Sequence, residues 1–237
     1  HADCEAHGAL PIPLLRCDGG VPPPLRRSAA AQPPPPLRRQ FCSQLGSHAG
    51  CRQPPVCGVE VALLSASCDF GGGVFFFSTP SGSHACLWRH RFPRSVRLNL
   101  SSFANPDGSI TNSDLELCGN IAHHHVIASI LDIREATIWT GSDNSANVFW
   151  NRKGSTTTTG PAAYLLQHQA LHQRRHRYIP LHDFVPGTAN AMADDCSRLW
   201  DLSDDALLAY FISSYPQTVS WTLCQLPSEV YSELSLI

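Results

Sequence analysis

Three acidic residues stand in separate motifs in the second half of the chain, and their chemistry could support metal-dependent hydrolysis. Glu116 belongs to TNSDLELCG, Asp143 to TGSDNSANVFW and Asp194 to NAMADDCSR. Carboxylate oxygens are the ligands that hard cations such as Mg²⁺ prefer. Two such ions held roughly 4 Å apart can activate a water molecule and stabilise the leaving oxygen of a phosphodiester. The three motifs therefore predict that carboxylates from different elements converge on one metal site.

Each of these acids also has a purely structural interpretation. Glu116 could complete a helix cap with Ser113 and interact favourably with the helix dipole. Asp143 could be a turn residue, and Asp194 or Asp195 could act on the dipole of a following helix. Taken one at a time, these interpretations are the simpler ones. The order of the three motifs along the chain favours a shared site.

The pattern of apolar residues predicts the elements that position these acids. The runs VEVALLSAS, GGVFFFST and HACLWRHRF predict antiparallel strands joined by tight turns, followed by a loop up to about residue 110. Helices are predicted from the Ser113–Glu116 capping-box spacing onward, over 161–176, and in the segments that start at 188 and 203. Strands are predicted over 136–143 and 177–187. This succession indicates an α/β fold with a mixed sheet flanked by helices.

The motifs together resemble the ribonuclease H domain of a retrotransposon reverse transcriptase, of the kind found in elements with a tyrosine recombinase. TNSDLELCG is similar to that family's polar turn followed by apolar-Glu-Leu, and TGSDN to its Thr/Ser-Asp-Asn/Ser strand end. VPGTANAMADDCSR resembles a signature with Val-Pro-Gly, Asn-x-x-Ala-Asp and Ser-Arg, in which Asp194 rather than Asp195 matches the acid. The resemblance covers residues 59–225 and implies a ribonuclease H-like mixed five-stranded sheet flanked by helices.

The resemblance also implies an activity, which is hydrolysis of the RNA strand of RNA–DNA hybrids. Glu116, Asp143 and Asp194 would hold two Mg²⁺ or Mn²⁺ ions. The hybrid would be recognised by its helical shape rather than by its base sequence. A reverse transcriptase domain outside this chain would be the partner that supplies most of the grip on the substrate.

The first strand departs from the family pattern, which reads Asp-Ala-Ser before Gly-x-Gly-Gly-Val and an aromatic residue. Aligning the run Gly71–Val74 places Ser65 at the position of the aspartate. Asp69, the nearest acid, lies roughly 13 Å further along an extended strand, so it could serve as a fourth catalytic residue only if the hairpin were reshaped. Because a hydroxyl is a neutral and poor ligand, we hypothesise that this copy has little or no nuclease activity. The alternatives are a catalytically inactive nucleic-acid-binding or connector domain, and a retroelement remnant.

Basic residues gather in the segment 152–177, where they could hold the phosphates of a hybrid. The candidates for nucleic-acid binding are Arg152, Lys153, Arg174, Arg175 and Arg177. The alternative is an ordinary solvated helix with basic residues at its C-terminal end, where the dipole favours them.

The histidines and cysteines indicate metal sites less strongly than the three acidic motifs do. His123, His124 and His125 are consecutive and point in different directions on a helix, so a partly exposed helix face is expected rather than a chelate. His168, His172 and His176 share a helical face at i, i+4 and i+8, but with no carboxylate nearby zinc is not the favoured interpretation. The ten cysteines contain no C-x2-C pair, which favours reduced thiols over structural zinc.

Composition predicts how the chain is organised. Residues 1–57, a Pro-, Arg- and Cys-containing segment with PPPLRR twice, are expected to be disordered because they cannot bury enough apolar surface. A ribonuclease H-like domain is expected over 58–202, and a C-terminal helix and connector over 203–237. Because the chain starts at His1, a fragment of a longer reading frame is expected. With no signal peptide and no membrane-spanning run, a cytoplasmic or nuclear location is expected.

Overall fold

The computed structural model describes residues 58–66, 69–157 and 160–234. The segment 1–57, which the sequence predicts to be disordered, lies outside the described residues. No helix in the described part of the chain is long and apolar enough to cross a membrane.

Three antiparallel strands form the centre of the sheet, as the sequence predicts. They are β1 (Gly58–Ala66), β2 (Phe70–Thr79) and β3 (Gly82–Arg91). Gly82 has a φ of 138° in the β2–β3 turn, a backbone conformation that glycine adopts without steric cost. The β1–β2 register places Ser65 opposite Gly72, so the C-terminal end of β1 lies beside the start of β2.

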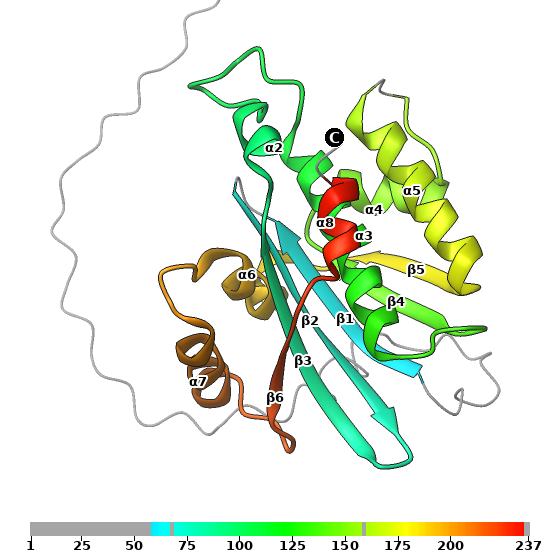
Figure 1. Cartoon of the computed structure of the whole chain (residues 1–237), viewed down its shortest axis with the longest axis vertical. Coiled ribbons are helices and arrows are strands. Elements are labelled where there is room, and N and C mark those ends of the chain that lie inside the picture. The colour runs from blue at the N-terminus through cyan, green and yellow to red at the C-terminus, as the bar shows by residue number, and fades with distance from the viewer. Residues whose placement is uncertain (1–57, 67–68, 158–159, 235–237) are drawn as a thin grey trace, which may run out of the picture. The chain divides into compact units, whose positions relative to one another are not determined.

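Parallel strands extend the sheet on both sides (Figure 1). β4 (Thr137–Ser142) pairs with β1, β5 (Ile179–Phe184) pairs with β4, and β6 (Trp221–Cys224) pairs with β3. The strand order is β5-β4-β1-β2-β3-β6. The predicted mixed sheet flanked by helices is confirmed, and in the described residues it has six strands rather than five. The additional strand, β6, comes from the segment in which the sequence predicts only a helix and connector.

Helices cover both faces of this sheet. The longer ones are α3 (Asn112–Ile130), α4 (Ser145–Lys153), α5 (Pro161–His176), α6 (Ala191–Arg198) and α7 (Asp204–Ser214). The shorter ones are α2 (Arg94–Leu98), the 3₁₀ turn Gly187–Ala189 and α8 (Ser228–Leu234). Side chains of a strand alternate between faces. Ala66 therefore lies under Gly119 of α3, while its neighbour Ser65 reaches α6 on the other face.

The start of α3 differs from the prediction of a Ser113–Glu116 cap. Thr111 is the N-cap instead. Its side chain accepts a hydrogen bond from the Asp114 backbone N–H, and the Asp114 carboxylate accepts one from the Thr111 backbone N–H at 2.8 Å. The pairing is the same capping box shifted by two residues. It leaves Glu116 outside the cap and free to face the sheet.

The prediction of a partly exposed histidine face on α3 is wrong for His123 and His124, which are 0% and 1% exposed. The reason is that α3 packs against the sheet, α4, α5 and α8, so little of its surface meets solvent. His123 Nδ1 accepts a hydrogen bond from the Trp88 indole at 2.6 Å, and His124 Nε2 lies 3.3 Å from Thr140 Oγ1. Burial lowers the pKa of His123 to about 3 and that of His124 well below its usual value.

Because these buried histidines are neutral, we expect the folded protein to lose stability at acidic pH. The unfolded chain gains a proton at each histidine below about pH 6.5, whereas the folded chain does not, so stability falls as pH falls through that range. Between pH 7.5 and 5, we expect a loss of about 2 kcal/mol for each fully buried histidine. Glu116, whose pKa is raised to about 8, changes in the opposite direction and offsets part of the loss.

Urea unfolding at pH 7.5 and at pH 5 measures this effect. His123→Gln keeps an acceptor for the Trp88 indole and removes the titrating ring, so its stability should depend less steeply on pH than that of the wild type. Equal pH slopes in the two proteins would contradict the assignment to His123.

Candidate active site

Four side chains from four elements meet at one end of the sheet. Ser65 is near the C-terminal end of β1, Glu116 is in α3, Asp143 follows β4, and Asp194 is in the first turn of α6. Leu64 pairs with Ser142, which brings the ends of β1 and β4 together. The Ser65 hydroxyl donates a hydrogen bond of 2.7 Å to Asp194 Oδ1. The three acids predicted from sequence are thus close neighbours, and Ser65 lies among them.

Glu116 is the most buried of the acids, with 2% of its surface exposed. Its carboxyl group accepts a hydrogen bond from the Ala66 backbone N–H at 2.8 Å and one from Ser142 Oγ at 3.2 Å. Burial, together with the charges of Asp143 and Asp194, raises the pKa of Glu116 to about 8 against the opposing effect of these hydrogen bonds. At neutral pH this carboxyl group is therefore mostly protonated.

Asn190, which served only to set the spacing of the Asn-x-x-Ala-Asp motif, interacts with Asp143. Asn190 is fully buried and donates a hydrogen bond of 3.0 Å from Nδ2 to the Leu64 carbonyl oxygen. Burial and the charge of Asp194 raise the pKa of Asp143, while a hydrogen bond with Asn190 opposes this shift. Asn190 therefore fastens the start of α6 to the backbone of β1, and its side chain affects the pKa of the acid that follows β4. The signal in the sequence that could have identified Asn190 is its position at the start of the Asn-x-x-Ala-Asp motif.

The adjacent acids Asp194 and Asp195 have different surroundings. Asp194 accepts the hydrogen bond from Ser65 and lies 3.4 Å from the Arg198 guanidinium. Asp195 accepts hydrogen bonds from the hydroxyls of Tyr210 at 2.8 Å and Tyr215 at 2.6 Å. Asp194 is thus part of the carboxylate cluster, whereas Asp195 links α6 to α7 and to Tyr215, the residue that follows α7.

Asp69 is not brought to the cluster. Its carboxylate lies 3.5 Å from the Arg97 guanidinium, and its carbonyl oxygen accepts a hydrogen bond of 2.9 Å from the Phe92 backbone N–H. Both contacts hold it against the segment that follows β3. Among the contacts of the described residues, none joins Asp69 to Glu116, Asp143 or Asp194.

Some basic residues proposed to bind nucleic acid are engaged within the protein. Arg152 forms an ion pair with Asp183 and donates a hydrogen bond of 2.6 Å to the His182 carbonyl oxygen. Arg177 forms an ion pair with Glu135.

The other three predicted nucleic-acid-binding residues are exposed. Arg174 and Arg175 lie far from the carboxylates, and Lys153 lies on the surface of α4. Arg174 and Arg175 are exposed at the C-terminal end of α5, just before the N-terminal end of β5. β5 runs parallel to β4, so they lie near the opposite end of the sheet from Asp143, roughly 20 Å away along a six-residue strand. Lys153 is exposed, with its ammonium 5.7 Å from the Phe149 ring.

A different group of basic and aromatic side chains lies at the carboxylate end and was missed from sequence. Phe70 begins β2 and stacks on Trp200, with 4.3 Å between ring centroids and 17° between planes. The exposed Arg91 guanidinium lies 5.5 Å from the Phe70 ring centroid. Arg198 is exposed on α6 beside Asp194. We call Phe70, Arg91, Arg198 and Trp200 the arginine–aromatic face.

The cluster does not fit a pair of divalent cations as it is folded. Its oxygen donors are of the right kind, but Ser65 contributes a neutral hydroxyl and Glu116 a mostly protonated carboxyl group. In the ranges 58–66, 69–157 and 160–234, no group of three or more His, Cys, Asp or Glu side chains is arranged to hold a metal ion. The cluster therefore offers a cation three carboxyl groups and one neutral hydroxyl.

Comparison with solved structures identifies likenesses at low sequence identity. No family model and no curated protein matches the chain. The structure is similar to the N-terminal RNase H domain of rv2228c from Mycobacterium tuberculosis, solved as a fusion with maltose binding protein. That match has 14% identity, covers 65% of this chain and 98% of that one, and has a TM-score of 0.37. RNase H1 from the halophilic archaeon Halobacterium salinarum NRC-1 matches at 18% identity, over 61% and 98% of the two chains, with a TM-score of 0.35.

Proposed function

We propose that this chain is a ribonuclease H-type domain from a retrotransposon reverse transcriptase, and that this copy binds RNA–DNA hybrids without cleaving them efficiently. The observation that supports the proposal is the hydrogen bond from Ser65 to Asp194 within the carboxylate cluster. A ribonuclease H site needs a carboxylate at the position of Ser65. Restoring that carboxylate should therefore restore Mg²⁺- or Mn²⁺-dependent hydrolysis.

Electrostatics is the reason that we expect serine in place of aspartate at position 65 to have a large effect on hydrolysis. An aspartate in place of Ser65 would add a negative charge next to Asp194, and the cluster would then attract a divalent cation strongly. Burial and the charges of Asp143 and Asp194 keep Glu116 mostly protonated at neutral pH when no cation is bound. With serine at position 65 the cluster has one carboxylate fewer, which weakens its attraction for divalent cations.

Two measurements on the full chain test this proposal. A labelled RNA–DNA hybrid should bind, as measured by fluorescence anisotropy, and its RNA strand should remain intact with Mg²⁺ or Mn²⁺. Efficient cleavage by the wild-type chain, abolished by Asp143→Asn, would show a working site. Absence of binding at low salt would remove the basis for the function.

We further propose that the arginine–aromatic face contacts the hybrid backbone next to the carboxylates. Arg91→Ala and Arg198→Ala should each weaken binding and lower the slope of log affinity against log salt by about 1, as expected for loss of one phosphate contact. Arg174→Ala and Arg175→Ala are matched controls, because both are exposed arginines near the other end of the sheet.

If the control variants lose more affinity than the Arg91 and Arg198 variants, the hybrid follows the surface that comprises Arg152, Lys153, Arg174, Arg175 and Arg177. In that case the arginine–aromatic face has no part in binding. Equal, small effects at both surfaces would exclude each of them as the main phosphate contact.

A further inference from the structure

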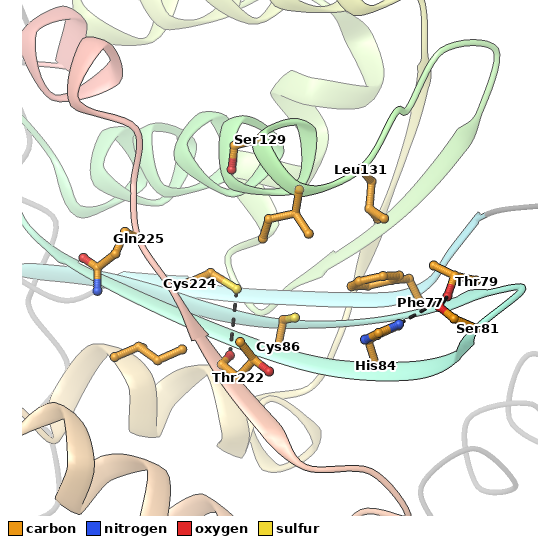
Figure 2. A pocket seen from close by; sticks show the side chains of 12 residues that line it. Phe77, Thr79, Ser81, His84, Cys86, Ser129, Leu131, Thr222, Cys224 and Gln225 are labelled. Atoms are coloured by element: carbon orange, nitrogen blue, oxygen red, sulfur yellow. Dashed lines mark hydrogen bonds between the residues drawn. The ribbon is translucent and has the colours of Figure 1, made fainter.

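A pocket of about 510 Å³ lies at the end of the sheet away from the carboxylates (Figure 2). Its walls come from the β2–β3 hairpin, the C-terminal end of α3 and the edge strand β6. Its volume is within the range of sites that bind small molecules. Exposed residues such as Ser81, Thr222 and Gln225 are part of its lining, so it communicates with solvent. The proposed function makes no use of it.

Two free cysteines line this pocket from neighbouring strands. In the parallel pairing of β3 and β6, Cys86 is opposite Thr222 and Trp88 is opposite Cys224, so the cysteines are diagonal neighbours. Both side chains line the same pocket, and each thiol affects the pKa of the other. Cys224 Sγ also lies 3.8 Å from the Thr222 carbonyl oxygen, a weak alternative acceptor. Both residues are mostly buried, at 4% and 8% exposed, and the pocket provides access to them.

The pair is chemically asymmetric. Interaction with the neighbouring Cys224 thiol lowers the pKa of the Cys86 thiol, against the opposing effect of burial. The same contact, together with burial, raises the pKa of the Cys224 thiol. The thiolate is the nucleophilic form of cysteine, and Cys86 is the thiol of the pair whose pKa is lowered.

We propose that Cys86 and Cys224 form an oxidisable dithiol, which closes to a disulfide between β3 and β6 when a small disulfide such as oxidised glutathione enters the pocket. The Cys86 thiolate attacks one sulfur of oxidised glutathione, the S–S bond breaks, and one glutathione leaves as a thiolate. Cys224 then attacks the Cys86 sulfur of the mixed disulfide and releases the second glutathione. Two protein thiols are oxidised, one glutathione disulfide is reduced, and the two thiol protons pass to the two leaving glutathione sulfurs.

Closure needs only a local movement of the chain. Diagonal neighbours lie roughly 7 Å apart, so the two Cβ atoms must approach to about 4 Å before the sulfurs reach a bond length of about 2 Å. β6 has four residues and lies at the edge of the sheet, so it can shift along β3 without breaking a second strand pairing. The new bond would tie the C-terminal segment with β6 and α8 to the central sheet.

Peptide mapping of the full chain tests the proposal. The protein is incubated with oxidised glutathione, free thiols are blocked with N-ethylmaleimide, and peptides are analysed by mass spectrometry without reduction. We expect a linked Cys86–Cys224 peptide, lighter by two hydrogen atoms than the sum of its parts. The melting temperature should rise by about 5 to 10 °C and return to its starting value on reduction.

Matched variants show whether the linkage depends on this pair. Cys86→Ala and Cys224→Ala should each abolish the linkage and the rise in melting temperature. Cys118→Ala should keep both, because Cys118 is a buried free thiol of α3 that does not line the pocket.

Three results would overturn the proposal, and the wild-type protein alone can produce each of them. The first is that Cys86 and Cys224 stay unlinked under oxidising conditions. The second is that either of them joins another cysteine instead. The third is a stable glutathione adduct on Cys86 that Cys224 does not displace.

Discussion

Replacing Ser65 with aspartate is expected to raise metal-dependent cleavage of the RNA strand of a hybrid by a factor of about 10² to 10³. The magnitude is that of one essential electrostatic group in an active site. The Ser65 side chain already lies 2.7 Å from Asp194, so the new carboxylate would enter the cluster without rearrangement of the strands. The measurement is the initial rate of cleavage of a labelled hybrid with Mg²⁺ or Mn²⁺.

Ser65→Asn is the matched control for this experiment, because it has the shape of aspartate without its charge. It should leave cleavage at the wild-type level, and Asp143→Asn in the Ser65→Asp background should abolish the gain.

The melting temperature of Ser65→Asp is a second measurement, and it does not depend on catalysis. Four acids packed together repel each other, so Ser65→Asp should melt at a lower temperature than wild type in the absence of divalent cations. Mg²⁺ should reverse this loss, because an ion that binds only the folded state stabilises it. A folded Ser65→Asp protein with neither cleavage nor a Mg²⁺-dependent rise in melting temperature would show that Ser65 is not the lost ligand position.

Substitution of Gly72 by alanine is expected to destabilise the fold by about 2 to 3 kcal/mol, the upper range for added volume in a packed core. A Cβ at this position would lie 2.6 Å from the Cys196 Cβ and 2.8 Å from the Cys196 carbonyl carbon. Backbone atoms of α6 cannot yield as a flexible side chain can, so the helix must move away from β2. That movement would also separate Asp194 from Ser65, because both lie at the same contact.

Gly71→Ala is the adjacent control. The Cβ there would meet the tip of the Phe92 ring at 3.3 Å, a contact that a side-chain adjustment can relieve. We expect a loss below about 1 kcal/mol, measured like that of Gly72→Ala by urea unfolding at pH 7.5. Equal losses in the two variants would mean that α6 does not approach the sheet at Gly72 as closely as the structure shows.

The glycine run illustrates how far the sequence could be interpreted. Its alignment with the motif of the family that the chain resembles led us to propose Ser65 as the changed position. The reason for glycine at position 72 became visible only in the structure, where the backbone of α6 crosses β2 at this point. Contacts between segments that are more than a hundred residues apart leave no local pattern in the sequence.

The sequence by itself determined most of the succession of strands and helices and indicated the three acids as candidates, because apolar periodicity and short motifs act over a few neighbouring residues. Only the tertiary structure decided how those residues are surrounded. It buried His123 and His124, shifted Glu116 to a mostly protonated state, and engaged Arg152 and Arg177 in ion pairs. It also recruited β6 from a segment without strong periodicity, where pairing with β3 outweighs weak local preference. Burial, charge state and strand pairing depend on distant segments that meet only in the folded chain.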